Sequence, residues 1–386
     1  MLGPADQTGV TRRDGDPDPA APTPHTQRLR VWQRLLAALL RAFAKLELLF
    51  DRVFWGLRRR FGRLRPLQVV TYRGYGTAAR AHVRGRVLEA SVLERSLPDD
   101  TRLRSFRRML RRFNSREVPE VAITAHWGDQ RVAGVTDDEG YFDLELVPGA
   151  PPPADHDWNK ARVEAVACPV RGLIPVQVAA EILIPSPAAE LGVISDIDDT
   201  VLQTHVTQKL KMIWVTLSGS AFTRMPFEGT TELYHALVAG SSGHANNPVF
   251  YVSKSPWNLY DFLVDFMDHH DLPRGPLLLR DIGLREAPPI DHKTDAVQRL
   301  FEAYPKLPFV LIGDSGERDP DIYLSVAARY PERVRAIYIR DLGAKHGSSG
   351  RAEASCEKAR ALGTEMLWVE HAREALEHAR KLRLVR

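Results

Sequence analysis

Three acidic residues follow a short apolar run in the segment LGVISDIDDT, which spans residues 191–200. They are Asp196, Asp198 and Asp199, and they stand where a buried strand would end. Carboxylates this close together repel one another, and each resists losing its water. A chain that gathers them at one strand end is therefore expected to neutralise them with a cation.

Other apolar runs also turn polar at their ends. The run PVFYVSKS reaches Ser253, PFVLIGDSG reaches Asp314 with Asp319 shortly after it, and Lys293 opens the helical segment DHKTDAVQRLFEAY. Carboxylates without a Cys or His ligand set suit a hard cation such as Mg²⁺. A lysine, a serine hydroxyl and backbone N–H groups at helix starts suit phosphate oxygens. These residue types indicate metal-assisted chemistry on a phosphate group.

The elements that would position these residues alternate between strand and helix from residue 191 onward. Such alternation predicts an α/β fold, a parallel sheet with helices on both faces. In sheets of this kind the ligand site lies beyond the carboxyl ends of the strands, and that is where the runs turn polar. The chemistry-bearing residues are therefore expected to meet at one edge of the sheet.

The motifs DIDDT, VSKS, HK and GDSGERDPDIY resemble, in order and spacing, the four motifs of the haloacid dehalogenase (HAD) superfamily of aspartate-based phosphatases. The longer stretches SDIDDTVLQT, YVSKSPWNLYDFL and LIGDSGERDPDIY resemble the App1-type phosphatidate phosphatase catalytic family, a relative of the lipins. The resemblance covers about 190–345. It implies a HAD-like Rossmannoid fold and a phosphatidate phosphatase, a phosphoric monoester hydrolase, with a β-rich domain before it.

The resemblance also implies roles for individual residues. Asp196 would be the nucleophile that forms an aspartyl-phosphate, and Asp198 the general acid and then the base. Ser253 and Lys293 would bind the phosphoryl group, and Thr200 would orient the loop beside it.

The same resemblance implies a Mg²⁺ site. Its ligands would be Asp196, the backbone carbonyl of Asp198, and Asp314, with Asp319 close by. The segment between Asp198 and Ser253 is short, so no large cap domain is expected and the site should be open to a large substrate.

Each of these positions has a plainer structural alternative. Ser253 could cap a helix before a proline, and Asp319 before a proline is also typical of a helix N-cap. Lys254 is expected at the surface. The role of the motif lysine has rivals in Arg280 and Arg285.

Four regions are predicted along the chain. Residues 1–27 are rich in Pro, Asp, Thr and Gly and read as a disordered tail. The spacing of apolar residues over 28–65 predicts a long amphipathic helix. The alternation of apolar and polar residues over 66–187, with a period of two, is typical of a small antiparallel β-sandwich. Residues 190–386 would form the HAD-like catalytic domain.

The predicted helix over 28–65 carries eleven Lys or Arg against two acidic residues. It could pack against protein, or it could lie on an anionic membrane surface, and the two are compatible. A second predicted helix, over 101–113, carries six arginines. These could form a solvent-exposed face, or they could contact acidic lipid or another polyanion.

Composition sets the remaining expectations. The 386 residues include two cysteines and have a formal net charge of +4, which argues against a disulfide framework and weakly favours a reducing compartment. No segment is apolar for long enough to span a bilayer. We expect a cytoplasmic protein, with peripheral membrane association left open and no nucleic-acid partner.

The sequence leaves three functions in competition. The first is a Mg²⁺-dependent phosphatase that hydrolyses phosphatidate to diacylglycerol and phosphate at a membrane surface. The second is the same chemistry on a soluble or macromolecular phosphomonoester. The third is a non-enzymatic lipid-binding module, which the presence of both Asp196 and Asp198 disfavours.

Overall fold

The structure is a computed structural model that describes residues 66–89, 117–147, 157–197, 229–280, 292–343 and 348–386. All of them belong to one compact unit, Gly62–Arg386. The helices predicted over 28–65 and 101–113 and the tail 1–27 lie outside the described residues.

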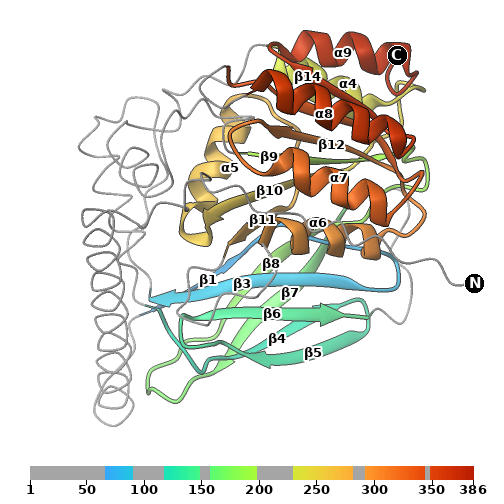
Figure 1. The fold of residues 1–386 in the computed structure, drawn as a ribbon. Helices are drawn as coiled ribbons and strands as arrows, with labels where there is room; N and C mark the ends of the chain where they lie inside the picture. Colours follow the sequence, from blue (N-terminus) through green and yellow to red (C-terminus); the bar gives the residue numbers. More distant parts are fainter. Residues whose placement is uncertain (1–65, 90–116, 148–156, 198–228, 281–291, 344–347) are drawn as a thin grey trace, which may run out of the picture. The chain divides into compact units, whose positions relative to one another are not determined.

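The amino-terminal part of this unit is built of strands, as its period-two pattern predicts (Figure 1). The strands are β1 (Leu67–Thr71), β2 (Gly74–Gly76), β3 (Ala81–Glu89), β4 (Ala122–Trp127), β5 (Gln130–Val135), β6 (Tyr141–Leu146), β7 (Trp158–Ala167) and β8 (Val176–Leu183). They form one eight-stranded sheet in the order β1-β3-β2-β8-β7-β4-β5, with β6 paired to β3. Every pairing is antiparallel except that of β2 with β8. The sandwich description stays a prediction.

The carboxyl-terminal part alternates strands and helices. The elements are β9 (Gly192–Asp196), α4 (Thr230–Ala239), β10 (Val249–Pro256), the 3-10 turn η2 (Trp257–Leu259), α5 (Tyr260–His269), β11 (Leu277–Arg280), α6 (His292–Ala303), β12 (Phe309–Asp314), α7 (Asp319–Arg329), β13 (Val334–Arg340), α8 (Ser348–Ala361), β14 (Glu365–Val369) and α9 (Ala372–Lys381). The six strands pair in parallel in the order β11-β10-β9-β12-β13-β14. The predicted α/β fold with a parallel sheet is confirmed.

Helices cover both faces of this sheet (Figure 1). Side chains of a strand point alternately to opposite faces, so neighbouring apolar residues enter different cores. Val193 packs with α4, α5 and α9, whereas the next residue, Ile194, packs with α6, α7 and α8. Continuous apolar runs are what a sheet buried on both faces requires.

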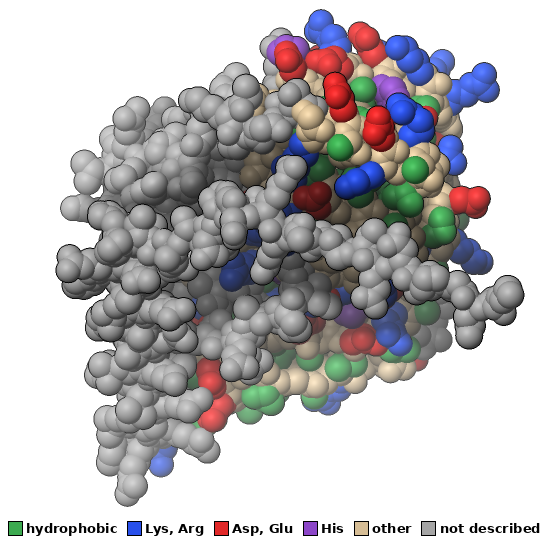
Figure 2. All heavy atoms as spheres, in the orientation of Figure 1, with side chains coloured by type: hydrophobic (Ala, Val, Ile, Leu, Met, Phe, Trp, Pro, Cys, Tyr) green, Lys and Arg blue, Asp and Glu red, His purple; other side chains and the backbone are tan. Residues whose placement is uncertain are grey.

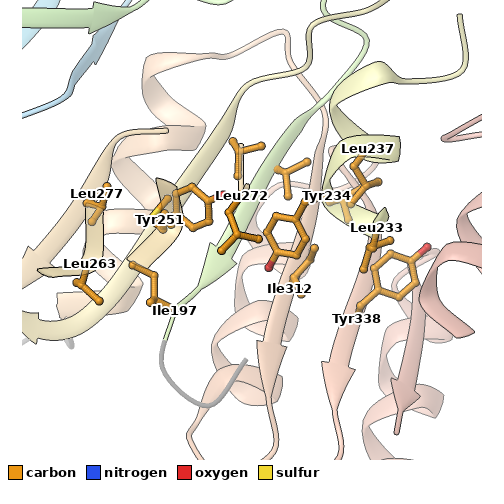
Figure 3. Close-up of a cluster of buried hydrophobic side chains, with 14 of the residues drawn as sticks. Ile197, Leu233, Tyr234, Leu237, Tyr251, Leu263, Leu272, Leu277, Ile312 and Tyr338 are labelled. Carbon is orange, nitrogen blue, oxygen red and sulfur yellow. The ribbon is translucent and has the colours of Figure 1, made fainter. Parts of the chain in front are cut away.

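The core on the α4 side reaches from Tyr251 to Tyr338, and Tyr234 of α4 lies over the strands beside Ile312 (Figure 3). The same core contains Tyr72 and Tyr141 of the antiparallel sheet. The two sheets therefore share buried apolar surface. The boundary that the sequence predicts near residue 190 stays a prediction.

The outer surface of the described carboxyl-terminal part carries both signs of charge. Figure 2 shows Lys and Arg side chains interspersed with Asp and Glu over the visible face, and α9 alone includes Arg373, Glu374, Glu377 and Arg380. This face presents no field of a single sign that would by itself attract a polyanion.

Candidate functional site

Asp196 is the last residue of β9, and its side chain is fully buried. The strand lies between β10 and β12, and the chain leaves it toward β10 before returning on its other side as β12. This reversal of strand order is the switch point at which open α/β sheets bind ligands, beyond the carboxyl ends of the strands. The topology places Asp196 at that crevice.

Lys293 faces Asp196 from the first turn of α6 and is also fully buried. Its Nζ lies 3.1 Å from Asp196 Oδ1, pairs with Asp319 Oδ1, and lies 3.4 Å from Glu317 Oε2. Burial lowers the pKa of Lys293, but the charges of Asp196 and Asp319 outweigh that effect and hold the pKa well above its usual value. The lysine is therefore a buried cation held among carboxylates.

Asp314 and Asp319 complete a group of three buried carboxylates with Asp196. One carboxylate oxygen from each lies within 4.8 Å of the others. The Asp314 Oδ1 accepts hydrogen bonds from the N–H groups of Gly316 at 2.7 Å and of Glu317 at 3.1 Å, which fixes the orientation of its carboxylate. This geometry could hold a hard divalent cation, whose preferred ligands are oxygens.

The Asp319 carboxylate is held at two points. Lys293 binds its Oδ1, and the backbone N–H of Asp314 donates to its Oδ2 at 3.2 Å. Burial raises the pKa of Asp319 to about 6, although Lys293 opposes the shift, and the charge of Asp314 adds to it. Without a bound cation, the ionised form of Asp319 is therefore less favourable than that of an ordinary exposed aspartate.

A glycine makes room for this carboxylate. A Cβ built on Gly313 would lie 2.3 Å from Asp319 Oδ2 and 2.7 Å from Asp319 Cβ. Contacts this short do not occur between real side chains, so Gly313 lets α7 approach β12 and brings Asp319 to the strand end.

A further ion pair lies beside the buried group. Lys254 Nζ is 3.0 Å from Glu317 Oε2, and these side chains are only 16% and 10% exposed. Lys254 and Lys293 thus lie among four carboxylates, those of Asp196, Asp314, Asp319 and Glu317, so these six described groups carry two negative charges in excess. A divalent cation would balance that excess, so the donor set and the charge both fit Mg²⁺.

Ser253 stands near the end of the neighbouring strand β10 and is fully buried. In the register of β9 and β10, Val252 lies opposite Asp196, so Ser253 comes one position beyond it. Its Oγ accepts a hydrogen bond from the N–H of Ser255 at 2.9 Å. This bond lies in the last part of β10, where the pairing with β11 shifts register between Val252 and Pro256, and we call this irregular strand end the Ser253–Ser255 turn.

The structure brings together Asp196, Lys293, Asp314 and Asp319, and it sets Ser253 on the adjacent strand end. The predicted residues Asp198 and Thr200, and the rival Arg285, lie outside the described residues. The other rival, Arg280, is exposed at the end of β11, whereas Lys293 is buried at the site.

Two expectations are wrong. Lys254 is not a surface residue, because its ion pair with Glu317 keeps it mostly buried. Asp319 is not the N-cap of α7, because the helix begins at Asp319 and Arg318 holds the capping position. The Asp319 carboxylate instead turns inward to Lys293.

Sequence reasoning also missed two contacts. Glu317 lies within the motif GDSGERD, and its position between two motif carboxylates was the available signal. The Tyr234 hydroxyl of α4 hydrogen-bonds Ser195, the residue before Asp196, and no feature of the sequence pairs these two positions.

Residues 191–341 match the family model described as the catalytic domain of phosphatidate phosphatase APP1. This segment is similar to the App1-type family, and we call it the App1-type segment. It contains the strand ends of β9, β10 and β12 that carry the candidate site residues, whereas the antiparallel sheet precedes it.

Two curated fungal proteins are similar to part of the chain. An uncharacterized protein of Schizosaccharomyces pombe is 31% identical over 157 residues, which cover 39% of this chain and 25% of the relative. Phosphatidate phosphatase APP1 of Saccharomyces cerevisiae is 30% identical over 155 residues, which cover 39% of this chain and 26% of the relative. The similarity to this App1-type protein thus spans about a quarter of the relative's length.

Among solved structures, a carbohydrate acetylesterase from Xanthomonas citri matches at 11% identity with a TM-score of 0.26, over 75% of this chain and 65% of the other. A TM-score this low carries no argument about the App1-type segment.

Proposed function

We propose that this protein is a Mg²⁺-dependent phosphatase that hydrolyses phosphatidate to diacylglycerol and phosphate. The observation that carries the proposal is the buried pair of Asp196 and Lys293, with Asp314 and Asp319 beside it, inside an App1-type segment. The strand order with its reversal between β9 and β12 supports a HAD-like Rossmannoid catalytic domain.

The proposed reaction has two steps. An oxygen of Asp196 attacks phosphorus, the bond from phosphorus to the diacylglycerol oxygen breaks, and Asp198 gives its proton to that leaving oxygen. Asp198 then takes a proton from water, whose oxygen attacks the phosphorus of the aspartyl-phosphate. Phosphate leaves, and the Asp196 carboxylate is restored.

The other residues act on charge and position. Lys293 stabilises negative charge on Asp196 and on the phosphoryl oxygens, which matters most in a water-excluded site. Ser253 would bind a phosphoryl oxygen, and Thr200 would orient the loop that carries Asp198. These are the positioning and electrostatic contributions that dominate phosphoryl transfer.

The proposed Mg²⁺ ligands are Asp196, Asp314 and the backbone carbonyl of Asp198, with Asp319 close by. The three buried carboxylates and the excess negative charge support this ligand set. The bound cation would supply charge neutralisation for the transferring phosphoryl group.

We propose that the substrate is taken from a membrane surface to which the protein binds peripherally. The basic segment over 28–65 supports this, although it lies outside the described residues. Among the described helices, none has the length and apolar character needed to cross a bilayer.

The test is phosphate release from phosphatidate in mixed micelles and from a panel of soluble phosphomonoesters, each with Mg²⁺ or with EDTA. The proposal expects Mg²⁺-dependent release from phosphatidate that falls when detergent dilutes the lipid at constant bulk concentration. Release from soluble esters alone would keep the chemistry and overturn the lipid substrate. Vesicle binding without release from any ester would support the binding-module alternative.

A further inference from the structure

The segment that follows the Ser253–Ser255 turn is packed against the antiparallel sheet. Trp257 of η2 is 8% exposed, and its ring stacks on that of Tyr72, with 4.5 Å between ring centroids and 26° between planes. The Arg84 guanidinium lies 4.8 Å from the Trp257 ring centroid. The indole therefore contacts an aromatic ring that directly follows β1 and a cation of β3.

Asn258, the next residue, is the hydrogen-bond acceptor of this contact. Arg86 Nη1 donates to its Oδ1 at 2.7 Å, and the Tyr141 hydroxyl donates to the same oxygen at 3.3 Å. Arg86 is only 5% exposed and also donates to Glu117 at 2.7 Å and to the carbonyl of Glu139 at 2.9 Å. The sheet thus fixes the guanidinium, and the guanidinium fixes Asn258.

Tyr260 makes the third contact between this segment and the antiparallel sheet. The backbone N–H of Arg73 donates to the Tyr260 hydroxyl at 2.8 Å, and the rings of Tyr72 and Tyr260 lie 4.5 Å apart. Within four positions of the chain, three residues contact the antiparallel sheet: Trp257, Asn258 and Tyr260.

The distance along the chain from this contact to the proposed phosphate site is short. The Ser255 N–H holds the Ser253 Oγ, and Pro256, whose ring restricts φ, connects the turn to Trp257. Little freedom remains between the anchored indole and Ser253. A shift of Trp257 or Asn258 would therefore move the turn.

We propose that Arg86 and Asn258 are positioning residues for the phosphate site, and that the antiparallel sheet holds the Ser253–Ser255 turn in its binding geometry. This inference rests on the proposed function and goes beyond it, because Arg86 lies outside the App1-type segment 191–341. That segment alone does not contain all the contacts that shape its site.

The test uses the full chain with three variants. Asn258→Ala removes the acceptor, Asn258→Asp keeps an oxygen for Arg86, and Arg274→Met is the matched control. Arg274, just before β11, pairs with Glu181 of β8 at 2.6 Å, so it too connects the two parts of the unit. Its side chain and that of Glu181 are 48% and 35% exposed, and neither contacts the turn among the contacts of the described residues. A general effect of weakening the contact between the sheets would appear in the control.

Two readouts are measured in each variant. One is hydrogen exchange of the amides from 253 to 260, and the other is steady-state kinetics on phosphatidate with inorganic phosphate as inhibitor. A misplacement of about 1 Å can cost about 100-fold in rate, so a partial shift should cost Asn258→Ala about tenfold in kcat/KM. The loss should come through KM, with weaker inhibition by phosphate, because bound and reacting phosphate both use the turn.

The expected result is faster exchange and weaker phosphate binding in Asn258→Ala, with Asn258→Asp and Arg274→Met close to wild type. Equal behaviour of Asn258→Ala and Arg274→Met in both readouts would overturn the inference. If wild-type protein releases no phosphate from any ester, the proposed function fails, and exchange alone then decides. Faster exchange over 253–260 in Asn258→Ala supports the positioning role, and unchanged exchange overturns it.

Discussion

Replacing Lys293 with methionine should destabilise the protein strongly, because it removes a buried cation and leaves its partners in place. Methionine has a similar length and no charge, so the substitution changes volume little. The ammonium pairs with Asp196 at 3.1 Å, with Glu317 at 3.4 Å, and with Asp319. Asp196 and Asp319 are fully buried, so once the ammonium is removed their carboxylates cannot be solvated by water instead.

The magnitude follows from these distances. At an effective dielectric constant of about 20, each pair contributes about 5 kcal/mol of Coulomb attraction, which the cost of burying the ions largely offsets. Removing one partner of a buried pair typically costs about 3–5 kcal/mol. At about 2 °C per kcal/mol for a chain of this size, the melting temperature should fall by about 6–10 °C.

The loss should depend on pH and on Mg²⁺. In the variant the Asp319 carboxyl, whose pKa burial already raises to about 6, loses the opposing charge of Lys293. Its folded-state pKa therefore rises further, and stability falls as pH rises above its unfolded value of about 4. The deficit should therefore be larger at about pH 8 than at about pH 5. Mg²⁺ at about 100 times its dissociation constant should restore about 2.7 kcal/mol.

The assay is thermal unfolding in EDTA and in Mg²⁺ for wild type, Lys293→Met and the control Lys306→Met, whose lysine is exposed. The control should match wild type. A Lys293→Met protein as stable as the control at both pH values would refute the account of a buried cation among carboxylates.

Three further outcomes are expected. Gly313→Ala should weaken Mg²⁺ binding in calorimetric titration, because a Cβ there would lie 2.3 Å from the Asp319 carboxylate. The control Gly350→Ala, which has open space around its Cβ, should bind Mg²⁺ as wild type does, and equal affinities of the two variants would contradict this geometry. Mg²⁺ affinity should fall as pH drops through about 6, where Asp319 takes up a proton that competes with the cation, and a flat profile from about pH 7.5 to 5 would count against Asp319. Removing residues 1–65 should greatly reduce sedimentation with anionic vesicles, since each basic residue near the surface contributes about 1 kcal/mol, and undiminished sedimentation would make the segment 28–65 structural.

The polar ends of apolar runs were the most informative part of the sequence. A strand buried on both faces must be apolar throughout, so Asp196 and Asp314 at the ends of β9 and β12 stand out against their neighbours. Parallel topology then brings such ends to one edge, which is why the grouping of Asp196, Asp314 and Lys293 could be predicted.

Contacts across long separations could not be predicted in the same way. Asn258 meets Arg86 across 172 positions, and only the packing of the two sheets pairs them. Lys254 was assigned to the surface because a lone lysine usually lies there, and its partner Glu317 comes from a different strand end.

The most direct test of the central claim compares wild type with Asp196→Asn for phosphate release from phosphatidate micelles in Mg²⁺, with circular dichroism to verify the fold. The account predicts Mg²⁺-dependent release by wild type and loss of turnover in Asp196→Asn, which keeps its fold and still binds vesicles. Turnover retained in Asp196→Asn would contradict the proposal that Asp196 is the nucleophile.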